Sequence, residues 1–280
     1  MGLSEAVIAA LLVIASRATS PCERILRADA PAQTGQATYV GQAEPEPGHA
    51  SEHPAIAGTW VVLGDSVTEK NFWAATSYYD YVCAELGCEV ANFGLSGTGY
   101  MASGAYGTGA FWERAERLDL AGVGCLTVFG SLNDLGKGFE LGAPTDETPY
   151  TIGGCMNLTM EALQAKRPDL PIGIVTPLPW RAGYGFLADG SVSPTATTPQ
   201  ECDAYVDLLL EVAGQHGLPV LDLYHSSPLD PNSEQDLALY YTSGYLQDEC
   251  GAHPNSAGHE LMSPLWREFV LGLVADAQGK

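Results

Sequence analysis

Positively charged side chains are scarce in this sequence. Only 12 Lys and Arg residues stand against 34 Asp and Glu residues in a chain of 280, which gives a formal net charge of -22. Nucleic acids and anionic membrane surfaces are bound through clustered cations that displace counterions. We therefore expect no nucleic-acid partner and no anionic membrane surface, and we expect any substrate to be neutral, because so acidic a protein repels anions.

Long apolar runs are also missing. The only sustained one covers residues 6–15 and is far too short to span a bilayer as a helix, so no membrane span is expected. Its length is typical of the apolar region of a signal peptide, and the small residues 18–20 could serve for cleavage, but Glu5 precedes it and no Lys or Arg does. Segment 1–27 is thus predicted to be either a secretion signal or an ordinary N-terminal helix.

The cysteines form no pattern typical of a zinc cluster or a disulfide scaffold. There are 7, an odd number, and none belongs to a Cys-x-x-Cys pair. A chain of this length needs no disulfides to hold its fold. We expect these side chains to act as small buried hydrophobic groups, with room for one incidental disulfide.

The sequence does contain enough apolar material for a large core. Hydrophobic residues make up 46% of the chain and charged residues 16%, which excludes a disordered acidic protein. Residues 28–57 are dense in Pro, Gly, Gln and Glu and have no apolar period, which is typical of an exposed linker. The predicted organisation is an N-terminal segment 1–27, a linker 28–57 and one domain over 58–280.

Within that domain, short apolar strands alternate with amphipathic helices. This alternation predicts an α/β fold, a three-layer sandwich with a central, mainly parallel five-stranded sheet and helices on both faces. Active sites of such sheets lie at the carboxyl ends of the strands. The expected strands are 59–64, 89–93, 125–129, 172–176 and 220–224, and the expected helices are 72–86, 151–166, 199–216 and 256–276.

Polar residues suited to catalysis follow the first three strands. Ser66 follows the first strand within Gly-Asp-Ser-Val-Thr, just before a predicted helix, where backbone N–H groups can stabilise an oxyanion. On this motif alone, a hydroxyl that caps the helix is the commoner role. Gly97 permits close backbone approach, in a phosphate cradle or a plain turn as well as in an oxyanion hole. Asn133 is a neutral amide donor or the start of an Asx turn, and Asp134 can hold its loop by accepting backbone hydrogen bonds.

Two histidines stand near the C-terminus in His-Pro-Asn-Ser-Ala-Gly-His. His253 precedes the last helix, and from there it can reach Ser66 and form the Ser-His pair that acyl transfer needs. His259 lies inside the helix. A metal site is not predicted, because the two histidines are six residues apart rather than four and no nearby acidic ligand completes the set.

The order of these four motifs resembles the SGNH hydrolase superfamily, whose members are often called GDSL esterases. The resemblance extends from about Gly58 to the C-terminal helix and rests on GDSVT, SGTG and HPNSAGH. It implies a carboxylic ester hydrolase with Ser66 as nucleophile and His253 as base, and it implies no cofactor and no metal. It also implies an oxyanion hole made by the N–H groups of Ser66 and Gly97 and the side chain of Asn133.

Two blocks depart from the pattern of the family. The asparagine block usually reads Gly-x-Asn-Asp, whereas here Ser131 and Leu132 separate Gly130 from the asparagine. The aspartate that usually orients the histidine stands three residues before it, and Cys250 occupies that position. A thiol cannot stabilise an imidazolium as a carboxylate does, so either a Ser-His dyad operates or another acceptor substitutes. The candidates are Asp248, Glu249 and a backbone carbonyl.

The substrate is expected to be the ester of a carbohydrate or of a short acyl chain. The insertions 138–149 and 177–199 are rich in Gly, Thr and Pro and lack the apolar cap of a lipase. Trp180, Tyr184 and Phe186 can form a sugar-stacking wall or simply pack the loop. The segments NFGLSGTGY and VFGSLNDLG are also similar to SGNH domains of bacteriophage tail-associated proteins, which favours a secreted or virion-associated O-acetylesterase.

Two other classes of protein stay open. The first is a catalytically weak or inactive SGNH domain that binds carbohydrate or serves as a structural part of a virion, which Cys250 and the linker favour. The second is a nucleotide-binding α/β protein that uses the glycine-rich stretch 94–109. The acidic charge and the missing Gly-Lys-Ser/Thr motif disfavour the second class.

Overall fold

The computed structural model describes residues 56–70, 73–104, 107, 109–181, 197–241 and 251–278. The predicted segment 1–27 and residues 28–55 of the predicted linker lie outside these ranges. Ile56, which the prediction assigns to the linker, has 7% of its surface exposed and packs in the core beside Trp60. The packed domain therefore includes at least this residue.

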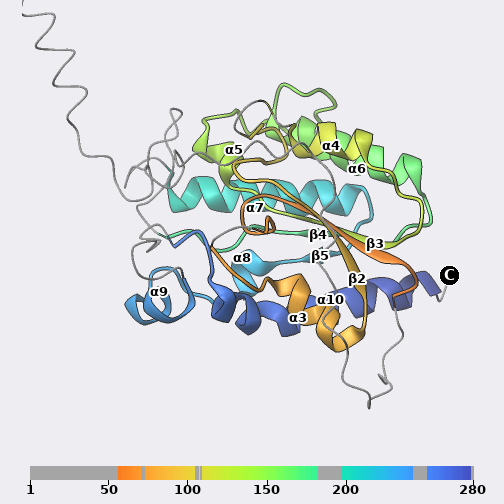
Figure 1. The fold of residues 1–280 in the computed structure, drawn as a ribbon. Helices are drawn as coiled ribbons and strands as arrows, with labels where there is room; N and C mark the ends of the chain where they lie inside the picture. The colour runs from red at the N-terminus through yellow and green to blue at the C-terminus, as the bar shows by residue number, and fades with distance from the viewer. Residues whose placement is uncertain are drawn as a thin grey trace, which may run out of the picture.

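The centre of the domain is a sheet of five parallel strands (Figure 1). The strands are β1 (Thr59–Gly64), β2 (Glu89–Gly94), β3 (Val123–Phe129), β4 (Ile172–Val175) and β5 (Val220–Leu221), in the order β2-β1-β3-β4-β5. The predicted fold class is confirmed, with every strand pair parallel. Because β2 lies on one side of β1 and β3 on the other, the chain reverses its direction of travel across the sheet between β1 and β3, where open α/β sheets bind their ligands.

Helices cover both faces of the sheet (Figure 1). One face carries α4 (Phe111–Arg117), α6 (Ile152–Lys166) and α7 (Pro199–Gln215), and the other carries α3 (Tyr78–Leu86) and α10 (Ser256–Gln278). The short helices are α5 (Asn133–Gly136), α8 (Leu223–Ser226) and α9 (Glu234–Tyr240). None of the described helices is long and apolar enough to cross a membrane.

Capping residues explain where α6 and α7 begin and where α3 ends. Thr198 and Glu201 form a capping box around the start of α7, and Pro199 supplies a first residue that needs no hydrogen-bond partner for its nitrogen. Thr151 caps α6 by accepting the N–H of Gly154 at 3.1 Å. Gly87 ends α3 in the left-handed conformation, with φ 66°.

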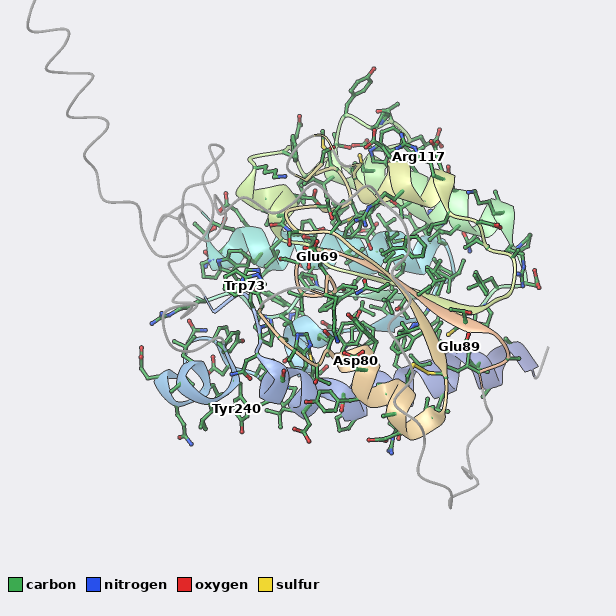
Figure 2. The ribbon with its side chains drawn as sticks, in the orientation of Figure 1. Glu69, Trp73, Asp80, Glu89, Arg117 and Tyr240 are labelled. Atoms are coloured by element: carbon green, nitrogen blue, oxygen red, sulfur yellow. A yellow bond between two sulfur atoms is a disulfide. The ribbon has the colours of Figure 1, made fainter. Side chains whose placement is uncertain are left out.

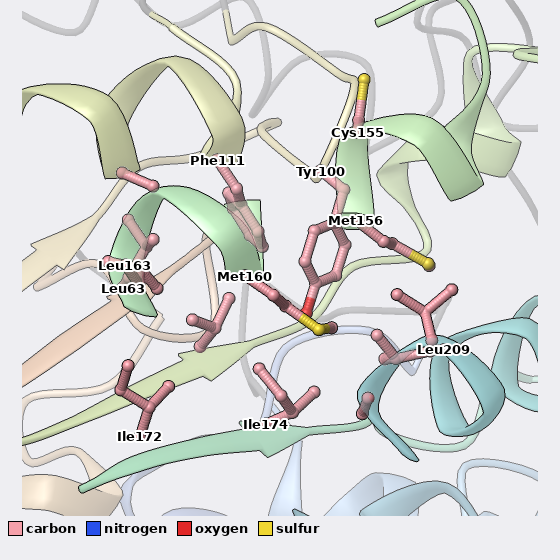
Figure 3. Packing of buried hydrophobic residues seen from close by; sticks show 14 of the residues in the cluster. Leu63, Tyr100, Phe111, Cys155, Met156, Met160, Leu163, Ile172, Ile174 and Leu209 are labelled. Carbon is pink, nitrogen blue, oxygen red and sulfur yellow. The ribbon is translucent and has the colours of Figure 1, made fainter. Parts of the chain in front are cut away.

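Two hydrophobic clusters fill the spaces between the sheet and its helices. The first packs Met156 and Met160 of α6 against Ile174 of β4 and Leu209 of α7 (Figure 3). The second is aromatic, and in it the rings of Tyr78 and Trp266 stack with centroids 4.0 Å apart. Apolar burial on both faces is what holds a parallel sheet of this kind.

Several predicted boundaries are wrong in detail. Helix α3 begins at Tyr78 rather than at residue 72, because Ser77 caps it and the side chain of Asp80 accepts the N–H of Ser77 at 2.7 Å. The strand expected over 220–224 ends at Leu221, because the side chain of Asp222 caps α8. Helices α4, α5, α8 and α9 were not predicted, since four to seven residues are too few to show a helical period.

The described cysteines agree with the expectation for them. Cys83 and Cys88 form a disulfide that joins α3 to the segment leading into β2. Three further described cysteines are buried and free of disulfides, namely Cys125, Cys155 and Cys202. Cys22 and Cys250 lie outside the described residues.

Candidate active site

Strands β1, β2 and β3 end in register with one another. Gly64, the last residue of β1, pairs with Gly94 at the end of β2 and with Phe129 at the end of β3. The loops that follow therefore leave the sheet along one line, next to the switch point of the topology. These loops carry the predicted site residues Ser66, Gly97 and Asn133.

Ser66 stands in a tight turn that directly follows β1. Oδ1 of Asp65 accepts the N–H of Val67 at 2.9 Å, and its carbonyl oxygen accepts the N–H of Glu69 at 2.9 Å. Burial raises the pKa of the Asp65 carboxyl, and hydrogen bonds from Ser131 and Val67 oppose that rise. The helix expected immediately after Ser66 is absent from this turn, because α3 begins only at Tyr78.

Glycines at the strand ends make room for this turn. A Cβ atom on Gly94 would lie 2.2 Å from the backbone nitrogen of Glu69, and one on Gly64 would lie 2.2 Å from Oγ1 of Thr68. Both distances are too short for any side chain. The turn that carries Ser66 can therefore fold back against β1 and β2 only because these two residues lack a Cβ.

His253 reaches Ser66 from the segment that precedes α10. Its Nε2 lies 2.9 Å from Oγ of Ser66, and only 8% of the histidine is exposed. Asn255 holds this segment, because its Nδ2 donates to the carbonyl oxygen of Tyr241 at 2.7 Å and its Oδ1 accepts the N–H of Gly258 at 3.1 Å. The structure thus brings together the serine and histidine that the sequence paired. The candidate orienting acids Asp248 and Glu249, together with Cys250, lie outside the described residues.

Gly97 and Asn133 lie in the two loops beside this pair. Gly97 has φ 72°, a left-handed conformation that favours glycine, and its Cα faces open space. Nδ2 of Asn133 donates to the carbonyl oxygen of Thr98 at 3.0 Å and to Oγ of Ser131 at 2.9 Å. Ser131 is the residue that departs from the usual asparagine block, and here its hydroxyl contacts both Asn133 and Asp65.

Asp134 fastens the loop that follows β2, which carries Gly97, to α5. Its buried carboxylate accepts the N–H groups of Tyr100 at 2.9 Å, Met101 at 3.0 Å and Ala102 at 2.6 Å, and the hydroxyl of Tyr205 at 3.1 Å. Burial raises the pKa of Asp134 to about 6, against the effect of these hydrogen bonds. Asp134 thus accepts backbone hydrogen bonds as expected, but they come from residues 100–102 rather than from its own loop.

The sequence did not single out Arg114, a residue of α4 that supports the ends of β1 and β2 and the loop that follows β2. Its Nη2 donates to the carbonyl oxygen of Gly64 at 3.0 Å and to Oγ1 of Thr98 at 2.8 Å, and its Nη1 donates to the carbonyl oxygen of Phe93. Burial lowers the pKa of Arg114 to about 10, and the nearby Asp65 opposes this shift. The low number of Lys and Arg residues was the only feature of the sequence that could have drawn attention to Arg114.

Three more residues around the site were missed. Glu69 accepts the N–H of Ser96 at 3.0 Å and so ties the turn that carries Ser66 to the loop that follows β2. Nζ of Lys137 donates to the carbonyl oxygen of Gly97 at 2.6 Å. Trp73 stacks on the ring of His253. Glu69 and Trp73 lie at the opposite end of the sheet from Glu89, the first residue of β2 (Figure 2).

Solved structures with this fold come from several bacteria. A protein from Lactobacillus plantarum superposes with a TM-score of 0.65 at 23% identity, over 78% of this chain and 98% of that one. The lipase/acylhydrolase from Enterococcus faecalis gives 0.51 at 19% identity, over 77% and 96%. Phospholipase A1 from Streptomyces albidoflavus gives 0.52 at 13% identity, over 76% and 99%. At these identities the likeness concerns the fold alone.

Matches to sequences give a narrower result. No protein among the curated ones matches the chain. The model of the GDSL-like Lipase/Acylhydrolase family matches residues 62–261, a range that includes Ser66, Gly97, Asn133 and His253. The match covers well over half of the 280 residues, and the chain therefore belongs to the GDSL-like lipase/acylhydrolase family.

Proposed function

We propose that this protein is a serine esterase that hydrolyses a neutral carboxylic ester through an acyl-enzyme on Ser66. The observation that carries the proposal is the distance of 2.9 Å between Oγ of Ser66 and Nε2 of His253, at the carboxyl edge of the sheet in a member of an acylhydrolase family. A serine hydroxyl is a weak nucleophile until an adjacent base takes its proton. His253 is the base within reach.

In the first half of the reaction, Nε2 of His253 takes the proton of Ser66 while Oγ attacks the ester carbonyl. The N–H groups of Ser66 and Gly97 stabilise the resulting oxyanion, and the left-handed backbone of Gly97 leaves its open side to the substrate. Asn133 contributes when one hydrogen of its amide turns from Thr98 or Ser131 toward the oxyanion.

In the second half, protonated His253 gives its proton to the leaving alcohol, and the acyl group stays on Ser66. Water then enters, His253 removes its proton, and the acid leaves from Ser66 by the same path. Apart from the substrate and this water, the steps use only groups of the chain. The mechanism applies equally to a dyad and to a triad with Asp248 or Glu249.

For the substrate we propose the O-acetyl ester of a carbohydrate or another short acyl ester. The support is the composition of insertions 138–149 and 177–199, which are rich in Gly, Thr and Pro, unlike the apolar cap of a lipase. Trp180 is partly buried and packs against the first core cluster, which favours loop packing for this aromatic residue. The disulfide between Cys83 and Cys88 supports a location outside the reducing cytoplasm.

A catalytically weak SGNH domain is the second candidate. The geometry of Asn133 favours it, because both hydrogens of its amide are already donated to Thr98 and Ser131. A side chain fixed in this way would leave only two backbone donors for the oxyanion. The loss of one oxyanion-hole donor costs about 100- to 1000-fold in kcat.

The proposal is tested by labelling with a fluorophosphonate and by release of acetate. We expect the phosphonate to modify Ser66, as located by peptide mass spectrometry, and p-nitrophenyl acetate to be hydrolysed faster than the octanoate. Acetate release from an acetylated polysaccharide identifies the carbohydrate preference. If the folded protein is not labelled at Ser66 and does not hydrolyse p-nitrophenyl acetate, the esterase proposal is contradicted. The catalytically weak SGNH domain is then the remaining candidate.

Lys137→Met is expected to lower kcat about tenfold and to leave KM nearly unchanged. The ammonium group is half-buried and donates to the carbonyl oxygen of Gly97, and a charge-assisted hydrogen bond is worth about 1.5 to 3 kcal/mol. Without this hydrogen bond, the loop that carries Gly97 is held less firmly in place. Steady-state kinetics with p-nitrophenyl acetate measures the effect.

Lys166→Met is the matched control for this change. Lys166 also donates to backbone carbonyls, at 2.8 Å to Leu118 and at 2.5 Å to Glu116, but these lie on the side of α4 and α6 away from Ser66. Equal kcat values for the two variants would show that Lys137 contributes only general stability.

A further inference from the structure

The indole ring of Trp73 lies flat against the imidazole of His253. The two ring centroids are 4.1 Å apart and the ring planes are inclined by only 2°. Each of the two residues has 8% of its surface exposed, so the stack is largely shielded from water. The edge of the same imidazole points Nε2 at Oγ of Ser66, at 2.9 Å.

The backbone around Trp73 is fastened to the helix that follows His253. The N–H of Thr76 donates to Oγ of Ser256 at 3.1 Å, and the hydroxyl of Tyr81 donates to the carbonyl oxygen of Ser256 at 3.2 Å. The N–H of Tyr78 donates to Nδ1 of His259 at 3.3 Å. Three hydrogen bonds thus join segment 73–81 to the first turn of α10. The stack therefore joins two parts of the chain that are already held in place.

This contact restricts the motion of the imidazole that matters for catalysis. Rotation of the ring about its bond to Cβ would carry Nε2 away from Ser66, and the flat indole blocks that rotation on one face. The face of an indole also attracts a cation through its quadrupole, more strongly when water is excluded. An imidazolium forms at His253 each time Ser66 gives up its proton.

We propose that Trp73 is a positioning residue that holds the imidazole of His253 in line with Ser66 and stabilises the imidazolium formed there. The proposal rests on the proposed esterase function. It assigns to an aromatic face part of the work that a carboxylate does in a Ser-His-Asp triad. It acts on the chemical step rather than on substrate binding, since Trp73 acts through His253.

The test compares Trp73→Leu with Trp73→Phe, using p-nitrophenyl acetate and the fluorophosphonate. We expect Trp73→Leu to lower kcat about 10- to 100-fold, as a small misplacement of a catalytic group does, with KM within about twofold of the wild type. The rate of labelling at Ser66 should fall in the same proportion, because it depends on the Ser-His pair. Trp73→Phe keeps an aromatic face and should restore kcat to within about fivefold of the wild type.

Trp112→Leu is the matched control, because it removes a partly buried indole from α4 on the other face of the sheet. It should leave kcat and labelling unchanged. Should Trp73→Leu fail to fold, Trp73→Met replaces it as the non-aromatic variant. With an active wild type, either of two results overturns the role of Trp73. In the first, Trp73→Leu or Trp73→Met has the same kcat as Trp112→Leu. In the second, the kcat of Trp73→Phe is no higher than that of Trp73→Leu. A wild type that is neither labelled nor active overturns the esterase function itself, and this proposal with it.

Discussion

Ser66→Ala and His253→Ala are each expected to lower kcat for ester hydrolysis by about 10,000-fold or more, and the double variant is expected to be no slower than the slower single one. The two groups act as a unit, because His253 has no proton to take once Oγ is gone and Oγ is not activated once the imidazole is gone. The residual rate should come from the oxyanion donors and from substrate binding. Steady-state kinetics of the wild type, the two single variants and the double variant with p-nitrophenyl acetate completes this double-mutant cycle.

Ser263→Ala provides the control for this cycle. The hydroxyl of Ser263 donates to the carbonyl oxygen of Glu260 within α10, away from Ser66, so its loss should leave kcat unchanged. Melting curves by circular dichroism show that each variant is folded. Effects of Ser66→Ala and His253→Ala that simply multiply in the double variant would mean that the two side chains work independently, which their distance of 2.9 Å argues against.

Acidification is expected to destabilise the fold through His259, a residue outside the proposed pair of Ser66 and His253. His259 has 2% of its surface exposed, and its Nδ1 accepts the N–H of Tyr78 at 3.3 Å. Burial lowers the pKa of His259 from 6.5 to about 3, and the charges of Lys70 and His253 act in the same direction. The imidazole is therefore neutral in the folded protein and protonated in the unfolded chain between these two pH values.

The sign of the effect follows from proton linkage. Between pH 6.5 and about 3, His259 binds a proton in the unfolded chain but not in the folded protein, so its contribution to the free energy of unfolding falls as the pH drops. The slope is about 1.4 kcal/mol per pH unit. Because a domain of this kind has only about 5 to 15 kcal/mol of stability, this single residue can account for much of its acid sensitivity.

The measurement is urea unfolding between pH 7 and 4, on the wild type and on His259→Asn. Oδ1 of the asparagine can still accept the N–H of Tyr78, but the amide takes up no proton, so the variant should lose less stability on acidification. The raised pKa values of Asp65 and Asp134 act in the opposite direction, and both proteins share them. The difference between the two proteins therefore isolates His259.

An exposed histidine among the described residues, His225, serves as the comparison for this prediction. The side chain of His225 is 55% exposed and pairs with Asp222 at 2.7 Å, so His225→Asn should leave the acid slope close to that of the wild type. If His259→Asn has the same slope as the wild type, the buried imidazole does not govern the acid response.

Much of the architecture could be predicted from local sequence. The apolar stretches that became β1 to β4 lie within two residues of their predicted bounds, and the starts of α6, α7 and α10 are within one residue, because Thr151, Thr198 and the break before Ser256 mark them. The start of α3 was missed, since the apolar residues before Ser77 continue its pattern while the capping box of Ser77 and Asp80 overrides it. Elements shorter than two helical turns leave no period to detect.

The sequence by itself determined the fold class, and it singled out the carboxyl edge of the sheet and Ser66, Gly97, Asn133 and His253 as the candidate site, because periodicity and motif order are local properties of the chain. Only the tertiary structure decided what surrounds them. The stack of Trp73 on His253, the support of the strand ends by Arg114 and the hold of Lys137 on Gly97 join residues from separate elements. Such contacts depend on the orientation of packed elements, and no spacing along the sequence encodes that orientation.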